Sequence, residues 1–354
     1  MIAIRFYRIY DVEREINLDF LEQALARNYF TSRASFLRVS PKSIMMENPP
    51  LLISMHPVTI EREGRFYELN AVVKVYDIGA ISLCFVYQDT EIPSSALFET
   101  ASLLAEPDQL SGLFSAYLKN LSEILPPYIA SQSIDPDFYE DYTIYVTDVI
   151  DPSIDSAVLL NGEQVLLSSH MREEIEKNTL SYTCDDQVIL SWDSALICNP
   201  EFPTDLIELI EFANVQVLEL RYYDRLLTNQ MTRMYDVIEQ ADRSSSFRRA
   251  RQYHAIMAHL MEIFADISEI TDKINNLIKV TEDIYYARVY AMVLKVLRVS
   301  QWSDSVDRKI DVIYKNYSML SDEVRIQHSN FLEWIVIILI AFEIGLAIWE
   351  YFVI

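Results

Sequence analysis

The sequence predicts an α+β N-terminal domain with a mainly antiparallel sheet, followed by a long antiparallel helical, coiled-coil-like stalk and a C-terminal transmembrane helix. Three observations lead to this prediction. Short β-branched and aromatic runs fill the chain up to Pro200, helical periodicity begins at Asp205, and the last stretch is mostly apolar. The predicted domains are residues 1–200 (α+β), 205–330 (a stalk of three long helices) and 331–354 (the transmembrane helix).

The first domain is assigned from runs of β-branched and aromatic residues that end at turn residues, as strands do. These runs are residues 2–10, 71–87, 143–150 and 187–192. Glu63-Gly64 and Asp77-Ile78-Gly79 have the composition of hairpin turns. Helical patterns lie near residues 94–106, 108–125 and 168–178. Strands interleaved with a few helices in this way indicate an α+β domain.

From Asp205 the apolar period becomes that of helices. Pro203 precedes Asp205, and Asp205 with Glu208 has the spacing of a capping box, so we expect a helix to begin there. Alternating 3–4 spacings run over residues 210–238, 256–277 and 306–334, with the polar break ADRSSS at 241–246. Such spacing places apolar residues on one seam, and short connections make consecutive helices antiparallel neighbours.

Asp224 is the one misfit in the first seam. It is close in sequence to Arg221 and Arg225. A carboxylate in an apolar seam needs a cationic partner, so we expect Asp224 to form a buried or half-buried ion pair that fixes the register of the helices.

The segment FLEWIVIILIAFEIGLAIWEYFVI, residues 331–354, predicts the membrane span. About twenty mostly apolar residues at ~1.5 Å each are enough to cross a ~30 Å hydrocarbon core. Trp334 and Trp349 would lie at the two interfaces. In the last helix, Lys and Arg occur only on the N-terminal side of this segment, which predicts a single-pass protein with a cytoplasmic N-terminal domain.

Three glutamates complicate that prediction. Glu333 and Glu350 fall at the edges of the segment, but Glu343 falls near its middle, where a charge costs roughly 2.5–3.5 kcal/mol. A neighbouring helix would hide Glu343, and Gly345 would permit close approach, so we expect a homo-oligomer. The alternative is a water-soluble helix whose apolar face packs on the domain.

The one basic cluster consists of Arg243, Arg248, Arg249 and Arg251, at the expected tip between two helices. Four arginines at about 1 kcal/mol each would hold that tip on anionic lipid headgroups. A solvated helix start is the alternative reading, although arginines at a helix N-terminus oppose the helix dipole.

The overall charge narrows the classes of partner. A net charge of −24 and a pI near 4.5 argue against direct nucleic-acid binding, which needs clustered Lys and Arg.

The cysteines Cys84, Cys184 and Cys198 form no CxxC pair, which indicates a reducing compartment with free, mostly buried thiols. The first residues resemble neither a secretory signal nor a transit peptide, so we expect the N-terminal part to stay in the cytoplasm.

The sequence contains no clear arrangement of catalytic or metal-binding residues. His254 and His259 are five residues apart, which places them on different faces of a helix. Carboxylates that could bind Mg²⁺ form two groups, Asp148, Asp151 and Asp155, and Asp185, Asp186 and Asp193. No Walker loop, GxGxxG or GxSxG occurs. We therefore predict no catalytic residue, no metal and no cofactor.

The ending Leu332-Glu333-Trp334-Ile335-Val336-Ile337-Ile338-Leu339-Ile340, followed by Glu343, resembles the C-terminal signature of the required-for-meiotic-nuclear-division (RMND/RMD) family. NVQVLELRYYD (214–224) and LIKVTEDIYYARVY (277–290) resemble an uncharacterised bacterial branch of that family. The resemblance implies a mixed α/β domain, long helices, a terminal anchor and a bacterial inner-membrane location. Eukaryotic members are mitochondrial inner-membrane proteins, and no catalytic residue carries over.

Three functions follow as hypotheses. The first is a non-enzymatic, membrane-anchored oligomeric scaffold or tether that presents its acidic domain to an unknown cytoplasmic protein, with the terminal helix in the lipid bilayer. Its interface residues would be Glu333, Trp334, Glu343, Gly345 and Trp349. The second is a membrane-bound metal-dependent enzyme that uses carboxylates of the N-terminal domain. The third is an oligomeric ion conduit lined by Glu343.

Overall fold

The computed structural model describes residues 1–12, 16–26, 30–33, 48–125, 134–162, 165–242, 257–258, 261, 265 and 283–353. The chain forms two compact units. The first combines residues 1–222 with 273–302, and the second combines residues 223–272 with 303–354. The sheet and most of the short helices belong to the first unit, and the second unit is helical.

The first unit is built on one sheet. In chain order its strands are β1 (Ile2–Asp11), β2 (Phe30–Arg33), β3 (Leu51–Ser54), β4 (Val58–Arg62), β5 (Arg65–Val75), β6 (Ala80–Asp89), β7 (Tyr139–Thr147), β8 (Thr179–Leu180), β9 (Gln187–Leu190) and β10 (Ser194–Cys198). The order across the sheet is β2-β3-β5-β6-β1-β7-β10-β9-β8, and β4 pairs with β5. β7 and β10 are parallel and the other pairs are antiparallel, so the sheet is mixed.

β1 lies in the middle of the sheet, between β6 and β7. Successive side chains of a strand point to opposite faces, and both faces of β1 are apolar. One core takes Ile2, Ile4 and Phe6, and the other takes Ala3, Tyr7 and Ile9. A strand that is apolar on both faces must be covered on both, which requires helices on each side of the sheet.

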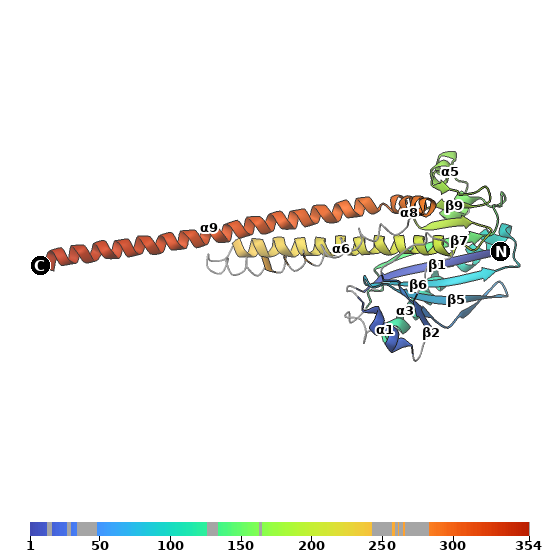
Figure 1. Cartoon of the computed structure of the whole chain (residues 1–354), viewed down its shortest axis with the longest axis horizontal. Coiled ribbons are helices and arrows are strands. Elements are labelled where there is room, and N and C mark those ends of the chain that lie inside the picture. The colour runs from blue at the N-terminus through green and yellow to red at the C-terminus, as the bar shows by residue number, and fades with distance from the viewer. Residues whose placement is uncertain are drawn as a thin grey trace. The chain divides into compact units, whose positions relative to one another are not determined.

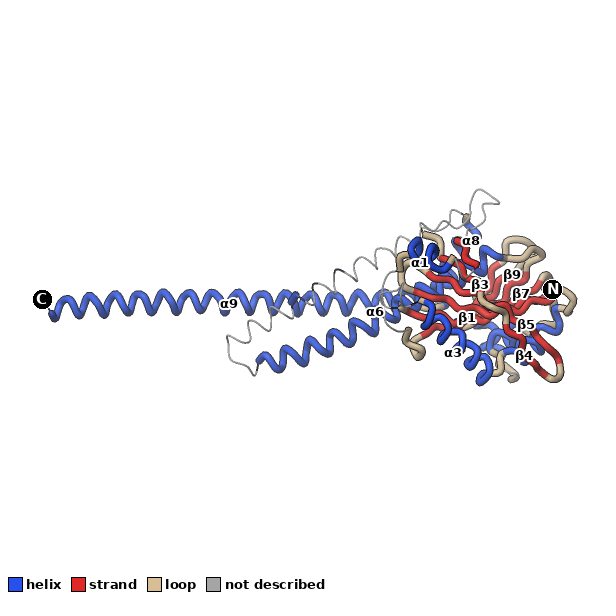
Figure 2. The backbone as a smooth tube through the Cα atoms, turned by 90° about the horizontal axis from the view of Figure 1, so that it is seen from below, coloured by secondary structure: helices blue, strands red, loops and turns tan. Residues whose placement is uncertain are grey.

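The first core lies under five short helices: α1 (Leu18–Leu25), α2 (Leu97–Leu104), α3 (Pro107–Ile124), α4 (Ser156–Asn161) and α5 (Ser169–Glu176). The second core is closed by the first half of α6 (Thr204–Asp242) and by α8 (Ile284–Val296). Figure 1 shows α1 and α3 on one side of the strands and α6 on the other. In Figure 2, α1 and α3 lie over the strands.

The local signals for this unit are confirmed. Helices α2, α3 and α5 lie where helical patterns occur, and the two hairpin turns join β4 to β5 and β5 to β6. Glu63 and Gly64 have φ of 48° and 76°, and Gly79 has φ of 104°. Two successive residues with positive φ make the type of two-residue turn that matches the twist of a hairpin.

In the second unit, α6 contacts α9 (Val299–Val353) through side chains at and near Asp224. Asp224 accepts from Ser305 at 2.7 Å and from Lys309 at 2.5 Å, and Lys309 also reaches Thr228 at 2.6 Å. Because Asp224 faces Ser305 while Thr228 faces Lys309, the two helices run in the same direction. The expected half-buried ion pair of Asp224 is confirmed, with Lys309 as its partner, whereas Arg221 pairs with Glu140. That the pair fixes the register of the helices stays a prediction.

The predicted stalk of three long antiparallel helices is wrong. The seam residues Ile210, Ala213 and Val217 are buried against the sheet, not against another long helix. The predicted second seam, residues 256–277, lies almost entirely outside the described residues. The helix described after it, α8, begins after Asp283, packs on the sheet and ends before Arg298, whose φ is 57°. Among the described residues no long coiled-coil stalk is evident.

The predicted C-terminal transmembrane helix is also wrong. Within the described part of the chain, no helix has the length and the apolar content needed to cross a membrane. The apolar run of α9 between Glu333 and Glu343 covers residues 334–342, which is roughly 14 Å at 1.5 Å per residue against a ~30 Å hydrocarbon core. The predicted bacterial inner-membrane, single-pass localisation and the ion conduit both depended on that helix, and they lose their basis with it.

The Asp224–Lys309 pair supplies a first test. Replacing Asp224 with Asn keeps a hydrogen-bond acceptor for Ser305 but removes the charge that Lys309 binds. Both side chains are about one-fifth exposed, so solvent weakens the pair, and we expect the free energy of unfolding to fall by about 1–2 kcal/mol. Urea unfolding followed by circular dichroism measures this change.

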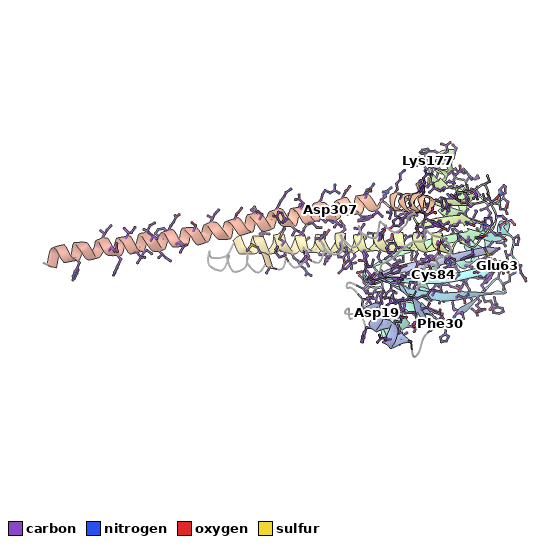
Figure 3. The ribbon with its side chains drawn as sticks, in the orientation of Figure 1. Asp19, Phe30, Glu63, Cys84, Lys177 and Asp307 are labelled. Carbon is purple, nitrogen blue, oxygen red and sulfur yellow. The ribbon has the colours of Figure 1, made fainter. Side chains whose placement is uncertain are left out.

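Asp307→Asn is the matched control, because Asp307 is an exposed residue of α9 (Figure 3) that forms no ion pair within the described residues. We expect it to change the free energy of unfolding by less than about 0.5 kcal/mol. Equal effects of the two substitutions would contradict a specific role for Asp224.

Candidate functional site

The most unusual surface of the described chain is the apolar segment of α9. Nine large apolar side chains between residues 334 and 344 are 39–65% exposed: Trp334, Ile335, Val336, Ile337, Ile338, Leu339, Ile340, Phe342 and Ile344. Successive helical residues are turned by about 100°, so the run from Ile335 to Ile338 covers every side of the helix. Apolar side chains exposed in one contiguous patch of this size mark an interaction surface.

The predicted interface residues are all on this helix. The side chains of Glu333, Trp334, Glu343 and Trp349 are exposed. At Gly345 nothing lies within 4 Å of the place where a Cβ would stand, so the backbone there is open to close approach by another helix. The predicted lipid-contact residues Arg243, Arg248, Arg249 and Arg251 lie outside the described residues.

The first carboxylate group is held by structural contacts. Asp148 pairs with the N-terminal ammonium of Met1 at 2.9 Å. Asp151 accepts from Ser94 at 2.7 Å and from both the backbone and the hydroxyl of Ser153. Hydrogen bonds from Ser153 and Ser94 lower the pKa of Asp151. A cavity of about 410 Å³ is lined by Asp151, but these contacts use its oxygens to shape a loop.

Asp155, the third member of that group, caps α4 by accepting from the backbone of Val158 and pairs with Arg172 at 2.8 Å. In the second group, Asp193 accepts from the Ser194 hydroxyl at 3.2 Å, and burial raises the pKa of Asp193. These contacts explain the positions of the Asp155 and Asp193 carboxylates.

Asp186 of the second group accepts from the backbone amides of Tyr182 and Thr183 and from the hydroxyls of Thr183 and Tyr285. These hydrogen bonds lower the pKa of Asp186 against the effect of partial burial, which raises it. Asp185 is exposed. Within the described residues no group of three or more His, Cys, Asp or Glu side chains is placed to hold a metal ion.

A layer of buried polar side chains lies between the sheet and α6, and the sequence analysis missed it. Lys74 of β5 donates to Glu211 at 2.8 Å and to Glu208 at 3.2 Å. The side chains of Lys74 and Glu211 are 9% and 2% exposed. Desolvation alone would lower the pKa of Lys74, but the two carboxylates raise it, so the ammonium stays charged. These contacts tie α6 to β5.

Glu219 is the exception in this layer. Its side chain is buried, and neither carboxyl oxygen has a hydrogen-bond partner. Burial, together with the nearby charge of Asp11, raises the pKa of Glu219 well above its usual range. The carboxyl therefore holds its proton more tightly in the folded protein than in the unfolded chain. The sequence contains a signal for this layer. The first half of α6 is apolar around the whole helix, and five polar residues interrupt that apolar surface: Glu208, Glu211, Asn214, Gln216 and Glu219.

The buried cysteine thiols are not candidates for a reactive nucleophile. Cys84 and Cys198 are buried and free, and Cys184 is exposed. Burial raises the pKa of the Cys84 thiol to about 12, and Cys84 lies among the strands (Figure 3). A thiol with such a pKa is not a nucleophile at neutral pH.

Together the fold and its surfaces define a two-unit protein in which a mixed sheet, covered by helices on both faces, is joined to a helical unit with an exposed apolar segment. Residues 1–204 match the protein family described as "Uncharacterized protein MJ0711, N-terminal domain". The chain belongs to this family.

The chain is similar to the "Uncharacterized protein MJ0711" of the archaeon Methanocaldococcus jannaschii, with 27% identity over 222 residues. The match covers 60% of this chain and 66% of the relative's own length, which is just under two thirds. No solved structure matches the chain.

Glu219 gives a second test, based on pH. A carboxyl whose pKa is raised on folding binds a proton in the folded state that the unfolded state has lost, so it makes the protein less stable as pH rises above about 4.3. Glu219→Gln removes this loss. The variant should be more stable than the natural protein at pH 7, and the difference should shrink toward pH 4, with a slope of up to about 1.4 kcal/mol per pH unit. Urea unfolding between pH 4 and pH 8 measures it.

Glu211→Gln is the control, because it removes the partner of a charged, buried Lys74. We expect this variant to lose about 2 kcal/mol or more at pH 7. A Glu219→Gln effect that is the same at every pH would show that folding does not raise the pKa of Glu219.

Proposed function

We propose that this protein is a non-enzymatic scaffold that self-associates through the apolar segment of α9 and presents its acidic sheet unit to a partner protein. The observation that carries the proposal is the exposure of nine large apolar side chains around one stretch of helix. Leaving such a surface in water costs roughly 25 cal/mol for each Å².

The size of the patch supports a second copy of this chain as its cover. Nine half-exposed side chains offer on the order of 100 Å² each, or about 900 Å², and a standard interface uses ~800 Å² from each partner. Because the apolar residues surround the helix, one neighbour leaves part of the patch in water. A bundle of several α9 helices covers it more completely.

Glu343 supports a specific arrangement of that bundle. A polar residue within an apolar seam selects the register and number of helices at some cost in stability. Gly345, close by, leaves room for a neighbouring backbone. The two residues therefore favour an ordered bundle over loose apolar clustering.

The acidic sheet unit supports a binding role rather than metal catalysis. In the described unit, Asp148, Asp151, Asp155, Asp186 and Asp193 each hold a loop end, a helix cap or a terminal group. Carboxylates occupied in this way do not converge on a common point as metal ligands do.

We also infer a distant relationship to the RMND/RMD family. It rests on Leu332–Ile340 followed by Glu343, and on the stretches 214–224 and 277–290. Under this inference the chain shares with that family an α/β domain joined to long helices.

Self-association has a direct test. Ile338 and Phe342 are four residues apart and lie on one face of α9, with exposed fractions of 62% and 65%. The double variant Ile338→Gln, Phe342→Gln should raise the dissociation constant of the oligomer about 100-fold, because each lost contact is worth at least ~1.5 kcal/mol. Sedimentation velocity of the full chain in detergent-free buffer measures it.

The control is Tyr314→Gln, Met319→Gln, which changes two exposed side chains of α9 outside the segment. It should leave the dissociation constant within about threefold. A natural chain that is monomeric at tens of micromolar, or that instead enters phosphatidylcholine vesicles through the same two residues, would contradict the proposal.

A further inference from the structure

A cavity of about 430 Å³ opens on the first unit and brings together three segments that are distant in the chain. They are the loop before β9, the loop before α6 and the start of α8. Its volume falls in the range of ~300–1,000 Å³ that ligand pockets occupy. The lining is unusual in combining three tyrosines with acidic side chains.

The tyrosine rings form one side of the cavity. The centroids of Tyr182 and Tyr285 are 5.4 Å apart, and those of Tyr285 and Tyr286 are 5.9 Å apart. The Tyr285 hydroxyl donates to Asp186 at 3.1 Å, and the α8 cap residue Asp283 accepts from its backbone amide at 2.7 Å, so this ring is held in place. Tyr182 is 76% exposed, which leaves part of its surface open to a ligand. Tyrosine faces attract cations through the ring quadrupole.

The charges of the lining all have one sign. Asp185, Asp186, Glu201 and Asp283 contribute carboxylates, and no Lys, Arg or His stands among the described residues that line the cavity. Asp185 and Glu201 are exposed, and neither carboxylate forms a hydrogen bond or ion pair within the described chain. Two independent features, aromatic faces and unpaired carboxylates, therefore favour the same kind of ligand, a cation.

The geometry favours an organic cation over a metal ion. The oxygens of Asp186 already accept from four donors, and no described set of three ligands is placed to hold a metal. Guanidinium is planar, stacks on aromatic rings and pairs with carboxylates, whereas a bare metal ion requires converging oxygens.

We propose that the cavity lined by Tyr182, Tyr285 and Tyr286 binds an arginine side chain carried by a partner protein. The guanidinium stacks on the tyrosine faces and pairs with Asp185 and Glu201. This inference rests on the proposed function, because it identifies the chemistry by which the scaffold holds its partner.

Titration of the full chain with N-acetyl-arginine N-methylamide, followed by ligand-observed NMR, tests the proposal. A dissociation constant on the order of 1 mM is expected, since exposed cation–π contacts and surface ion pairs are each weak. Asp185→Asn, Glu201→Gln should weaken binding at least about fivefold, and Tyr182→Leu should weaken it about threefold. Circular dichroism verifies that the variants are folded.

The matched control is Glu68→Gln, Glu99→Gln, which removes two exposed carboxylates away from the cavity and leaves the same net charge as the cavity double variant. Equal weakening by both double variants would show general attraction to an acidic protein and would overturn the site. Displacement of the probe by millimolar Mg²⁺ at constant ionic strength would indicate a metal site and would overturn it as well.

Comparing the blocked probe with free arginine distinguishes an arginine side chain in a protein from the free amino acid as the ligand. A peptide-borne side chain predicts that the blocked probe binds at least as tightly as free arginine, and tighter binding of the free amino acid would overturn a protein partner. Sedimentation separates the two proposals, because the cavity variants should keep the oligomer. A monomeric natural chain that still binds the probe overturns self-association and leaves the arginine site standing.

Discussion

The packing of the first half of α6 on the sheet is the contact on which the rest of the structure depends. β1 is apolar on both faces, so the sheet needs cover on both sides, and α6 supplies much of it on one. Lys74 makes the orientation of this apolar contact specific, because its ammonium group pairs with the carboxylates of Glu208 and Glu211. Apolar contact alone tolerates sliding and rotation, whereas a buried charge with two partners fixes the helix in one position.

Polar contacts also order the helical unit. α6 runs without interruption to Asp242, and in its second half Asp224 pairs with Lys309 of α9. Polar pairs within apolar contacts recur in this chain: Lys74 with its two glutamates in the first unit, and Asp224 with Lys309 in the second. Each selects one alignment of helices that apolar residues by themselves would leave undetermined.

The chain presents two chemically different surfaces. The sheet unit presents carboxylates, several of which bind helix caps and loops, and the tyrosine-lined cavity holds two, Asp185 and Glu201, that form no such contact within the described chain. The far part of α9 presents apolar side chains. An acidic surface suits a cationic partner and an apolar helix suits another helix, so the two proposed interactions use different chemistry and do not compete.

The local elements could be predicted from the residue patterns alone. Residue patterns located β1, the hairpin at Glu63-Gly64, helices α2 and α3, the change of period near Asp205 and the ion-pair role of Asp224, because each depends on neighbours in the chain. The partner of Asp224, the start of α8 after Asp283 and the burial of Ile210 against the sheet depend on tertiary contacts that the local pattern does not contain. Periodicity shows that a helix face is apolar but not what covers it, and for that reason the predicted stalk and span failed. Asp186, Glu201 and Tyr285 likewise meet at one cavity only after the chain folds.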